Sequence, residues 1–168
     1  KNKNLSQILD LKKIEAVNRP IETANGLPNE CYVSKDYLVY EKERIFCDKW
    51  TVVGVGSSIP NPGDVKPYNL LGIPLILIRG KDMKIRVFHN VCSHRGFKLL
   101  EKSCTLRNVI RCPYHFWSYD FEGNLISTPH IGGLNKHNSD QFDKNKNLSQ
   151  ILDLKKIEAV NRPIETAN

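Results

Sequence analysis

Short stretches of alternating apolar and polar residues dominate the middle of the chain and predict β-strands. Four stretches rich in Val, Ile and Leu lie at residues 50–55, 64–70, 74–79 and 84–90, separated by turn residues. The last two should form a hairpin across residues 80–83, and residues 117–121 and 125–128 should form another across residues 122–124. Many short strands joined by tight turns predict a mostly β fold, a small antiparallel β sandwich.

Nearer the N-terminus, apolar residues recur at helical intervals and no longer alternate with polar ones. Apolar residues recur at helical intervals after Ser34, which predicts a helix over residues 36–50 with Ser34 as its N-cap. A second amphipathic helix is predicted within residues 5–17, ending before Arg19 and Pro20. The sheet protein is therefore expected to carry a helical segment at its N-terminal side.

Residues 1–25 return without change as residues 144–168. Duplicated structural repeats drift in sequence, so an exact copy is not the signature of a solenoid or a repeat array. We expect an N-terminal helical or flexible segment over residues 1–26, a domain over residues 27–133, a polar linker over residues 134–143, and a helical or disordered second copy. Two identical apolar faces also allow a homo-oligomer in which one copy docks on a neighbouring molecule.

Length and charge narrow the class of protein. The 168 residues, 40% of them hydrophobic, suffice for one domain with a real core. No apolar run approaches the length of a membrane span and no signal-peptide pattern is present, so a cytoplasmic protein without a membrane partner is expected. The net charge of +7 is spread along the chain without an aromatic and basic platform, which argues against a nucleic-acid partner.

Two mixed pairs of metal-binding residues stand close together in the chain: Cys92 with His94, and Cys112 with His115. Two thiolates and two imidazoles can hold a single zinc ion or a pair of irons. Zinc fingers usually group like ligands, whereas here each short turn mixes them, which favours two adjacent irons. The remaining cysteines form an odd set without paired spacing and are expected to be buried or free thiols: Cys31, Cys47 and Cys104.

The strings HNVCSHRG and RCPYHFWSYDFEGNL resemble the two cluster loops in the N-terminal domain of the large subunit of Rieske-type non-haem iron oxygenases, the ring-hydroxylating and quaternary-amine enzymes. The resemblance covers about residues 27–133. It implies a 2Fe–2S cluster that transfers single electrons, with Cys92 and Cys112 on the inner iron and His94 and His115 on the outer iron. A stand-alone Rieske ferredoxin and a zinc-stabilised binding module remain the alternatives.

The same resemblance places further residues around the cluster. Respiratory Rieske proteins carry a hydroxyl and a tyrosine five and seven residues after the second cysteine, where this chain has Trp117 and Tyr119. With one hydrogen-bond donor to the sulfurs missing, the reduction potential should fall toward the low end of the family range, about −150 mV. Those proteins also join their loops by a disulfide, at the positions of Phe97 and Tyr114 here. The residues expected beside the cluster are Arg95, Gly96, Tyr114, Trp117 and Tyr119.

One residue departs from the family pattern. The position after His115 is usually a small residue, commonly Gly, and here it is Phe116. If that backbone needs a positive φ, a bulky residue there should cost on the order of 1 kcal/mol.

The resemblance also implies partners, namely a ferredoxin or flavin reductase as electron donor and a mononuclear-iron oxygenase domain as acceptor. The remaining histidines have no helical setting for such an iron and are expected to be surface residues: His89, His130 and His137. The chain is therefore expected to be an oxidoreductase component, truncated before the catalytic domain and without a complete catalytic site of its own.

Overall fold

The computed structural model describes residues 4–129 and 147–148, and the chain divides into two compact units between Thr51 and Val52. The sequence suggested a boundary after Gly26. The division falls later because α1 and α4 contact one another within the first unit, where the Lys13 ammonium also lies 3.7 Å from the Glu30 carboxylate. The helices on either side of Gly26 therefore belong to the same unit.

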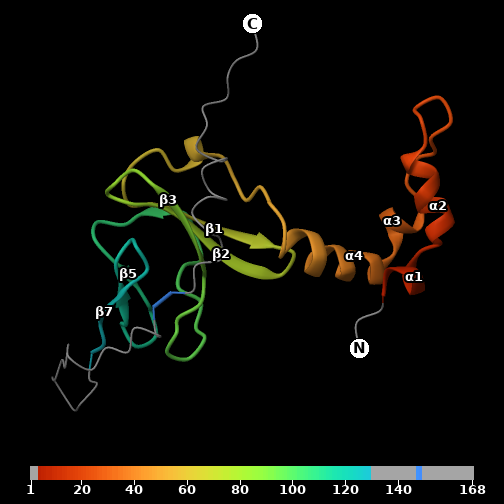
Figure 1. Ribbon diagram of the computed structural model, residues 1–168. Coiled ribbons are helices and arrows are strands. Elements are labelled where there is room, and N and C mark those ends of the chain that lie inside the picture. The colour runs from red at the N-terminus through yellow and green to blue at the C-terminus, as the bar shows by residue number, and fades with distance from the viewer. Residues whose placement is uncertain (1–3, 130–146, 149–168) are drawn as a thin grey trace, which may run out of the picture. The chain divides into compact units, whose positions relative to one another are not determined.

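The first unit contains short helices, labelled in Figure 1. A single helix over residues 5–17 was expected, and that prediction was wrong because the helix is interrupted at Asp10. The Asp10 carboxylate accepts a hydrogen bond from the Lys12 N–H at 3.0 Å and so starts a new helix. The elements are α1 (Leu5–Ile8), α2 (Leu11–Glu15), the 3-10 helix η1 (Ala16–Asn18), α3 (Glu30–Val33), α4 (Lys35–Glu41) and the π-helix η2 (Lys42–Phe46).

The cap predicted at Ser34 is confirmed. Its hydroxyl accepts a hydrogen bond from the Tyr37 N–H at 3.2 Å at the start of α4. The helix does not run to Trp50 as expected but ends with η2 at Phe46. It stops there because the Thr51 hydroxyl donates to the Phe46 carbonyl at 3.0 Å, which satisfies an acceptor that a further helical turn would have used.

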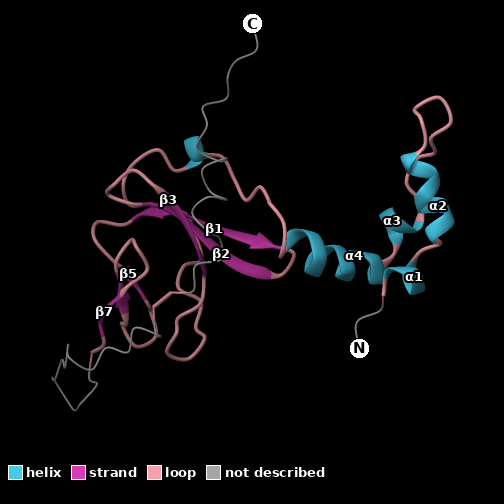
Figure 2. Ribbon diagram, viewed as in Figure 1, coloured by secondary structure: helices cyan, strands magenta, loops and turns pink. Residues whose placement is uncertain are grey.

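The second unit contains two antiparallel sheets, so the predicted fold class is confirmed. Figure 2 shows β1, β2 and β3 side by side in the larger sheet and β5 and β7 in the smaller one. Among the described residues the larger sheet has the order β3-β2-β1-β4 and the smaller β5-β6-β7. The strands are β1 (Asp64–Leu70), β2 (Ile73–Arg79), β3 (Ile85–His89), β4 (Cys104–Thr105), β5 (Ile110–Arg111), β6 (Ser118–Tyr119) and β7 (Leu125–Ser127).

Both predicted hairpins are present. The β2–β3 hairpin pairs Ile78 with Arg86, and the β6–β7 hairpin pairs Ser118 with Ser127. The second hairpin turns at Gly123, whose φ is +90°. A Cβ at this position would lie 2.5 Å from the Phe88 ring, so both the turn conformation and the packing of the two sheets require glycine.

The strand expected over residues 50–55 is absent from the described structure, where these residues have no paired neighbour. The Val53 side chain is buried at 4% exposure, whereas Val52 and Val55 are 76% and 50% exposed. The alternation in this stretch therefore reflects the burial of one side chain, which does not require backbone pairing.

The core of the second unit lies between the two sheets and continues into the loops that carry Cys92 and Cys112. Leu148, from the second copy of the duplicated segment, is buried in this core, and its N–H donates to the Gly123 carbonyl at 2.8 Å. The expected linker and the rest of the second copy lie outside the described residues. Within the described ranges, no helix has the length and apolar character needed to span a bilayer.

Candidate metal centre

Two loops with the same backbone scaffold carry the four predicted metal ligands. Loop 1 (residues 92–97) follows β3, and loop 2 (residues 112–117) connects β5 to β6. In loop 1 the Cys92 N–H donates to the Phe97 carbonyl at 2.7 Å, and the Gly96 N–H donates back to the Cys92 carbonyl at 2.9 Å. In loop 2 the corresponding bonds are 2.8 and 3.0 Å long, from Cys112 to Trp117 and from Phe116 to Cys112. Each scaffold presents its cysteine and histidine from one tight turn.

The structure brings the four predicted ligands together. The cysteines belong to the core, with Cys92 at 2% and Cys112 at 1% exposure, and the histidines are half-buried. The ring centroids of His94 and His115 lie 4.8 Å apart, with the rings inclined at 69°. Two thiols thus lie on the buried side of the site and two imidazoles on its outer side.

Tyr119 supports the thiol side of the site. Its hydroxyl lies 3.3 Å from the Cys92 sulfur, and its ring is fully buried. Burial raises the pKa of the Tyr119 phenol well above its ordinary value, so the phenol keeps its proton as a hydrogen-bond donor. Burial also raises the pKa of the Cys92 thiol, which favours the protonated form as long as no metal ion compensates the charge.

Aromatic rings surround the two imidazoles. The Trp117 ring stacks on His94 with centroids 4.5 Å apart and planes inclined at only 6°. The Tyr114 ring lies against His115 with centroids 3.7 Å apart, and it also contacts Phe97 of the other loop at 5.4 Å. The rings of Tyr114 and Phe97, 51% and 45% exposed, form the outer rim of the site.

The two loops differ at the turn position four residues after the cysteine. Gly96 and Phe116 occupy equivalent places in the scaffold, and both have positive φ values, 69° and 60°. Strain was expected at Phe116 if its backbone needs a positive φ, and the backbone here is left-handed. The Phe116 ring is 53% exposed. Arg95, which was expected beside the site, is exposed.

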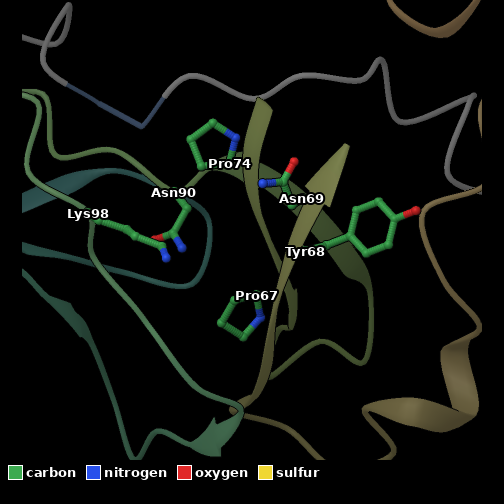
Figure 3. A pocket seen from close by; sticks show the side chains of 6 residues that line it. All are labelled: Pro67, Tyr68, Asn69, Pro74, Asn90 and Lys98. Atoms are coloured by element: carbon green, nitrogen blue, oxygen red, sulfur yellow. The ribbon is translucent and has the colours of Figure 1, made fainter. Parts of the chain in front are cut away.

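A buried asparagine holds the return of loop 1. The Asn90 side chain accepts hydrogen bonds from the N–H groups of Leu99 and Leu100 at 3.1 and 2.9 Å and donates to the Leu100 carbonyl at 2.6 Å. Figure 3 shows Asn90 beside Lys98. These two residues, which flank loop 1, line a pocket of about 180 Å³ together with residues of β1 and β2. The backbone of Leu99 and Leu100 already occupies the amide of Asn90, so we assign this side chain to the support of loop 1 and no ligand to the pocket.

The other predicted histidines do not join this site in the described residues. His89 lies on β3, where burial lowers its pKa and keeps the imidazole neutral, while His130 and His137 lie outside the described residues. In the part of the chain that the structure describes, no group of three or more His, Cys, Asp and Glu side chains converges to hold a single metal ion. The sequence interpretation missed Ser93, whose hydroxyl lies 2.8 Å from that of Tyr119; its place between two ligands was the available signal.

Comparison with known families decides the assignment, because the Rieske 2Fe-2S domain matches residues 49–138. The chain belongs to this family. Rieske domains bind a 2Fe–2S cluster through two thiolates and two imidazoles, and the buried thiols and outer imidazoles of this site fit that donor set. The resemblance inferred from the loop sequences is therefore confirmed at the level of the family and its cofactor.

The relatives of this Rieske domain are oxygenase subunits. The chain is 39% identical over 121 residues to the carnitine monooxygenase oxygenase subunit of Acinetobacter pittii, covering 70% of this chain and 33% of that protein. It is 34% identical over 109 residues to the benzene 1,2-dioxygenase subunit alpha of Pseudomonas putida, covering 65% of this chain and 24% of that protein. The chain thus spans about a third or less of the length of these curated relatives.

Solved structures agree with this family assignment. The quaternary ammonium Rieske monooxygenase CntA, in complex with gamma-butyrobetaine, is similar to this chain with a TM-score of 0.63 and 36% sequence identity. The similarity covers 73% of this chain and 34% of that chain. Naphthalene 1,2-dioxygenase from a Rhodococcus species gives a TM-score of 0.60 at 29% identity, covering 68% of this chain and 26% of that chain. The similar region is therefore a Rieske domain of the kind found in oxygenases, a domain type that transfers electrons.

Proposed function

We propose that this chain is the electron-entry domain of a Rieske-type oxygenase, with its cluster held by Cys92, His94, Cys112 and His115. The observation that carries the proposal is the pairing of the four donors in two loops of identical scaffold. The core position of both thiols supports Cys92 and Cys112 as ligands of the inner iron. The half-buried imidazoles support His94 and His115 as ligands of the outer iron.

Each element of the site has a task in this proposal. When bound, the cluster accepts and releases one electron at a time. The scaffold hydrogen bonds fix the direction of each cysteine, and the stacked Trp117 ring fixes the orientation of His94. Tyr114 lies between His115 and solvent, so the electron would leave or enter on the side where Tyr114 and Phe97 are exposed.

The partners follow from the same proposal. The donor would be a ferredoxin or flavin reductase, and the acceptor would be a mononuclear-iron oxygenase domain. Support for the acceptor comes from the relatives, which are oxygenase subunits matched over about a third or less of their length. The chain would then be one redox component of an oxygenase, and the substrate would be bound by the acceptor.

The reduction potential of the cluster should lie toward the low end of the family range, about −150 mV. A hydroxyl group that donates to a ligand sulfur stabilises the reduced cluster, and two such donors occur in the high-potential members. Here the Tyr119 hydroxyl lies beside a cysteine sulfur, whereas the second position holds Trp117, which stacks on a histidine.

Iron, acid-labile sulfide and zinc should be measured per chain on protein purified without oxygen. The proposal expects two irons and two sulfides, a reddish-brown oxidised state and an electron paramagnetic resonance signal that appears on reduction. Stoichiometric zinc without sulfide would instead show a zinc-stabilised binding module and end the proposal. A potential well above 0 mV would remove the argument from the missing hydroxyl but leave the cluster assignment intact.

A further inference from the structure

Three contacts meet at the hydroxyl oxygen of Tyr119. The Cys92 sulfur lies 3.3 Å away, the Ser93 N–H 3.2 Å away and the Ser93 hydroxyl 2.8 Å away. The Tyr119 side chain is fully buried on β6, so its hydroxyl must find its partners within the protein. Ser93 supplies two of the three contacts, one from its backbone and one from its side chain.

The chemistry of the groups favours one direction for each hydrogen bond once a metal binds Cys92. A phenol oxygen has one proton and two lone pairs, and a backbone N–H can only donate. A metal-bound cysteine is a thiolate and can only accept. The Tyr119 proton therefore goes to the sulfur, the Ser93 N–H fills one lone pair, and the Ser93 hydroxyl donates to the other.

We propose that Ser93 is a positioning residue that directs the Tyr119 hydroxyl proton at the sulfur of Cys92. This inference rests on the proposed function, because it requires a cluster bound at Cys92. The Ser93 hydroxyl also polarises the Tyr119 O–H bond, since hydrogen bonds in a chain strengthen one another. A stronger donor to the sulfur stabilises the reduced cluster, so Ser93 raises the reduction potential through Tyr119.

The opposite hydrogen-bond direction makes an opposite prediction. If Tyr119 donated its proton to the Ser93 hydroxyl, the serine would draw the proton away from the Cys92 sulfur. Removing the serine hydroxyl would then free the proton and raise the reduction potential. The sign of the shift in Ser93→Ala thus distinguishes the two arrangements.

The test measures the reduction potential of the full cluster-loaded chain by spectroelectrochemistry, together with the Fe–S(Cys) stretching bands in resonance Raman spectra. Ser93→Ala should lower the potential by a fraction of the drop seen in Tyr119→Phe, and Ser93→Thr, which keeps a hydroxyl, should restore it. In a Tyr119→Phe background, Ser93→Ala should cause no further shift. Ser118→Ala serves as the control, because its hydroxyl is also buried on β6 but bonds to the Phe116 carbonyl.

An unchanged or raised potential in Ser93→Ala would overturn the inference, as would an equal drop in the presence and absence of the Tyr119 hydroxyl. A drop of the same size in Ser118→Ala would also overturn it, because the effect would then be general to the loops. These failures are distinct from failure of the proposed function, in which the unmodified chain binds no iron and sulfide at all.

Discussion

The two loops of the metal centre reach one backbone scaffold with different residues. In both loops the cysteine N–H and carbonyl close the same pair of hydrogen bonds, and the turn requires a positive φ. Loop 1 meets this requirement with Gly96, which adopts it freely, and loop 2 meets it with Phe116, which does so at a cost. The conformation is therefore imposed by the scaffold, and the residue at the turn only determines how much strain remains.

The loops also differ in how the surrounding structure holds them. Loop 2 lies between paired strands, since Arg111 of β5 is opposite Ser118 of β6. Loop 1 has β3 on one side only, and its return is held by the side chain of Asn90. A loop closed by strand pairing can tolerate a strained residue, whereas a loop held by one side chain depends on that side chain.

Loss of a cysteine from either loop should have the largest effect. Cys92→Ser and Cys112→Ser should each abolish binding of iron and acid-labile sulfide, because each loop supplies one thiolate to the same cluster. Cys104→Ser is the matched control, since this cysteine is exposed on β4, outside both loops, and its loss should leave the metal content unchanged. A full complement of cluster in either ligand variant would show that the loops do not act as a pair.

Loss of the Asn90 side chain should show how strongly loop 1 depends on it. Asn90→Ala leaves three backbone groups of Leu99 and Leu100 without their side-chain partner and should reduce the free energy of unfolding by about 3 kcal/mol. Urea denaturation of the cluster-loaded chain measures this. Asn69→Ala removes an exposed amide with one bond, to Gly72, and should cost about 1 kcal/mol. Equal costs for the two variants would contradict the dependence of loop 1 on Asn90.

The Tyr119 hydroxyl should distinguish the loops electronically, because it lies beside the sulfur of loop 1. Tyr119→Phe should lower the reduction potential by about 60 mV. The reduced cluster carries one more negative charge, so the hydrogen bond to the sulfur is stronger in that state. A difference of about 1.4 kcal/mol between the two states is a tenfold change in the equilibrium, or about 59 mV for one electron. Spectroelectrochemical titration measures the shift, and an unchanged potential would show that this hydroxyl does not stabilise the reduced state.

The sequence was sufficient wherever local chemistry determines the structure. Residues 80–83 and 122–124 have turn residues at hairpin spacing, and both hairpins form as predicted. The cap at Ser34 was equally local, because it needs only a hydroxyl within reach of a backbone N–H three residues later. The four cysteine and histidine residues could be paired from spacing alone, and the structure brings them together.

The sequence was insufficient wherever the structure depends on distant partners. Strands β4 and β5 are two residues long each, too short for any periodicity, and exist because a neighbouring strand pairs with them. The stretch at residues 50–55 has the opposite property, since its pattern is strand-like and no partner pairs with it in the described structure. The place of Ser93 between two ligands was visible in the sequence, but its role was not, because that role depends on a tyrosine that another strand places against it.

Reciprocal substitutions at the turn position measure the backbone strain in each loop. Gly96→Ala should cost about 1 kcal/mol of stability, since a Cβ there meets no atom within 4 Å and only the positive φ penalises it. Phe116→Ala is the control that removes the ring but keeps a Cβ at the positive φ. Phe116→Gly should be more stable than Phe116→Ala by slightly less than about 1 kcal/mol, the size of the Gly96→Ala cost. Urea denaturation measures both changes in stability. Gly26→Ala is the control for Gly96→Ala, because a Cβ at Gly26 also meets no atom within 4 Å but the backbone there has no positive φ. A gain in stability for Gly96→Ala, or a loss for Phe116→Gly relative to Phe116→Ala, would refute a common scaffold.

The contact between Phe97 and Tyr114 should give the smallest effect and measures how far the two loops support one another. The rings meet at 5.4 Å from opposite loops, at positions where respiratory relatives of this family carry a disulfide. A double-mutant cycle with Phe97→Ala and Tyr114→Ala should give a coupling free energy of about 0.5 kcal/mol, the low end for an aromatic pair, because both rings are about half exposed. Tyr114→Phe retains the ring and should retain the coupling. A coupling of zero would contradict mutual support of the two loops through these rings.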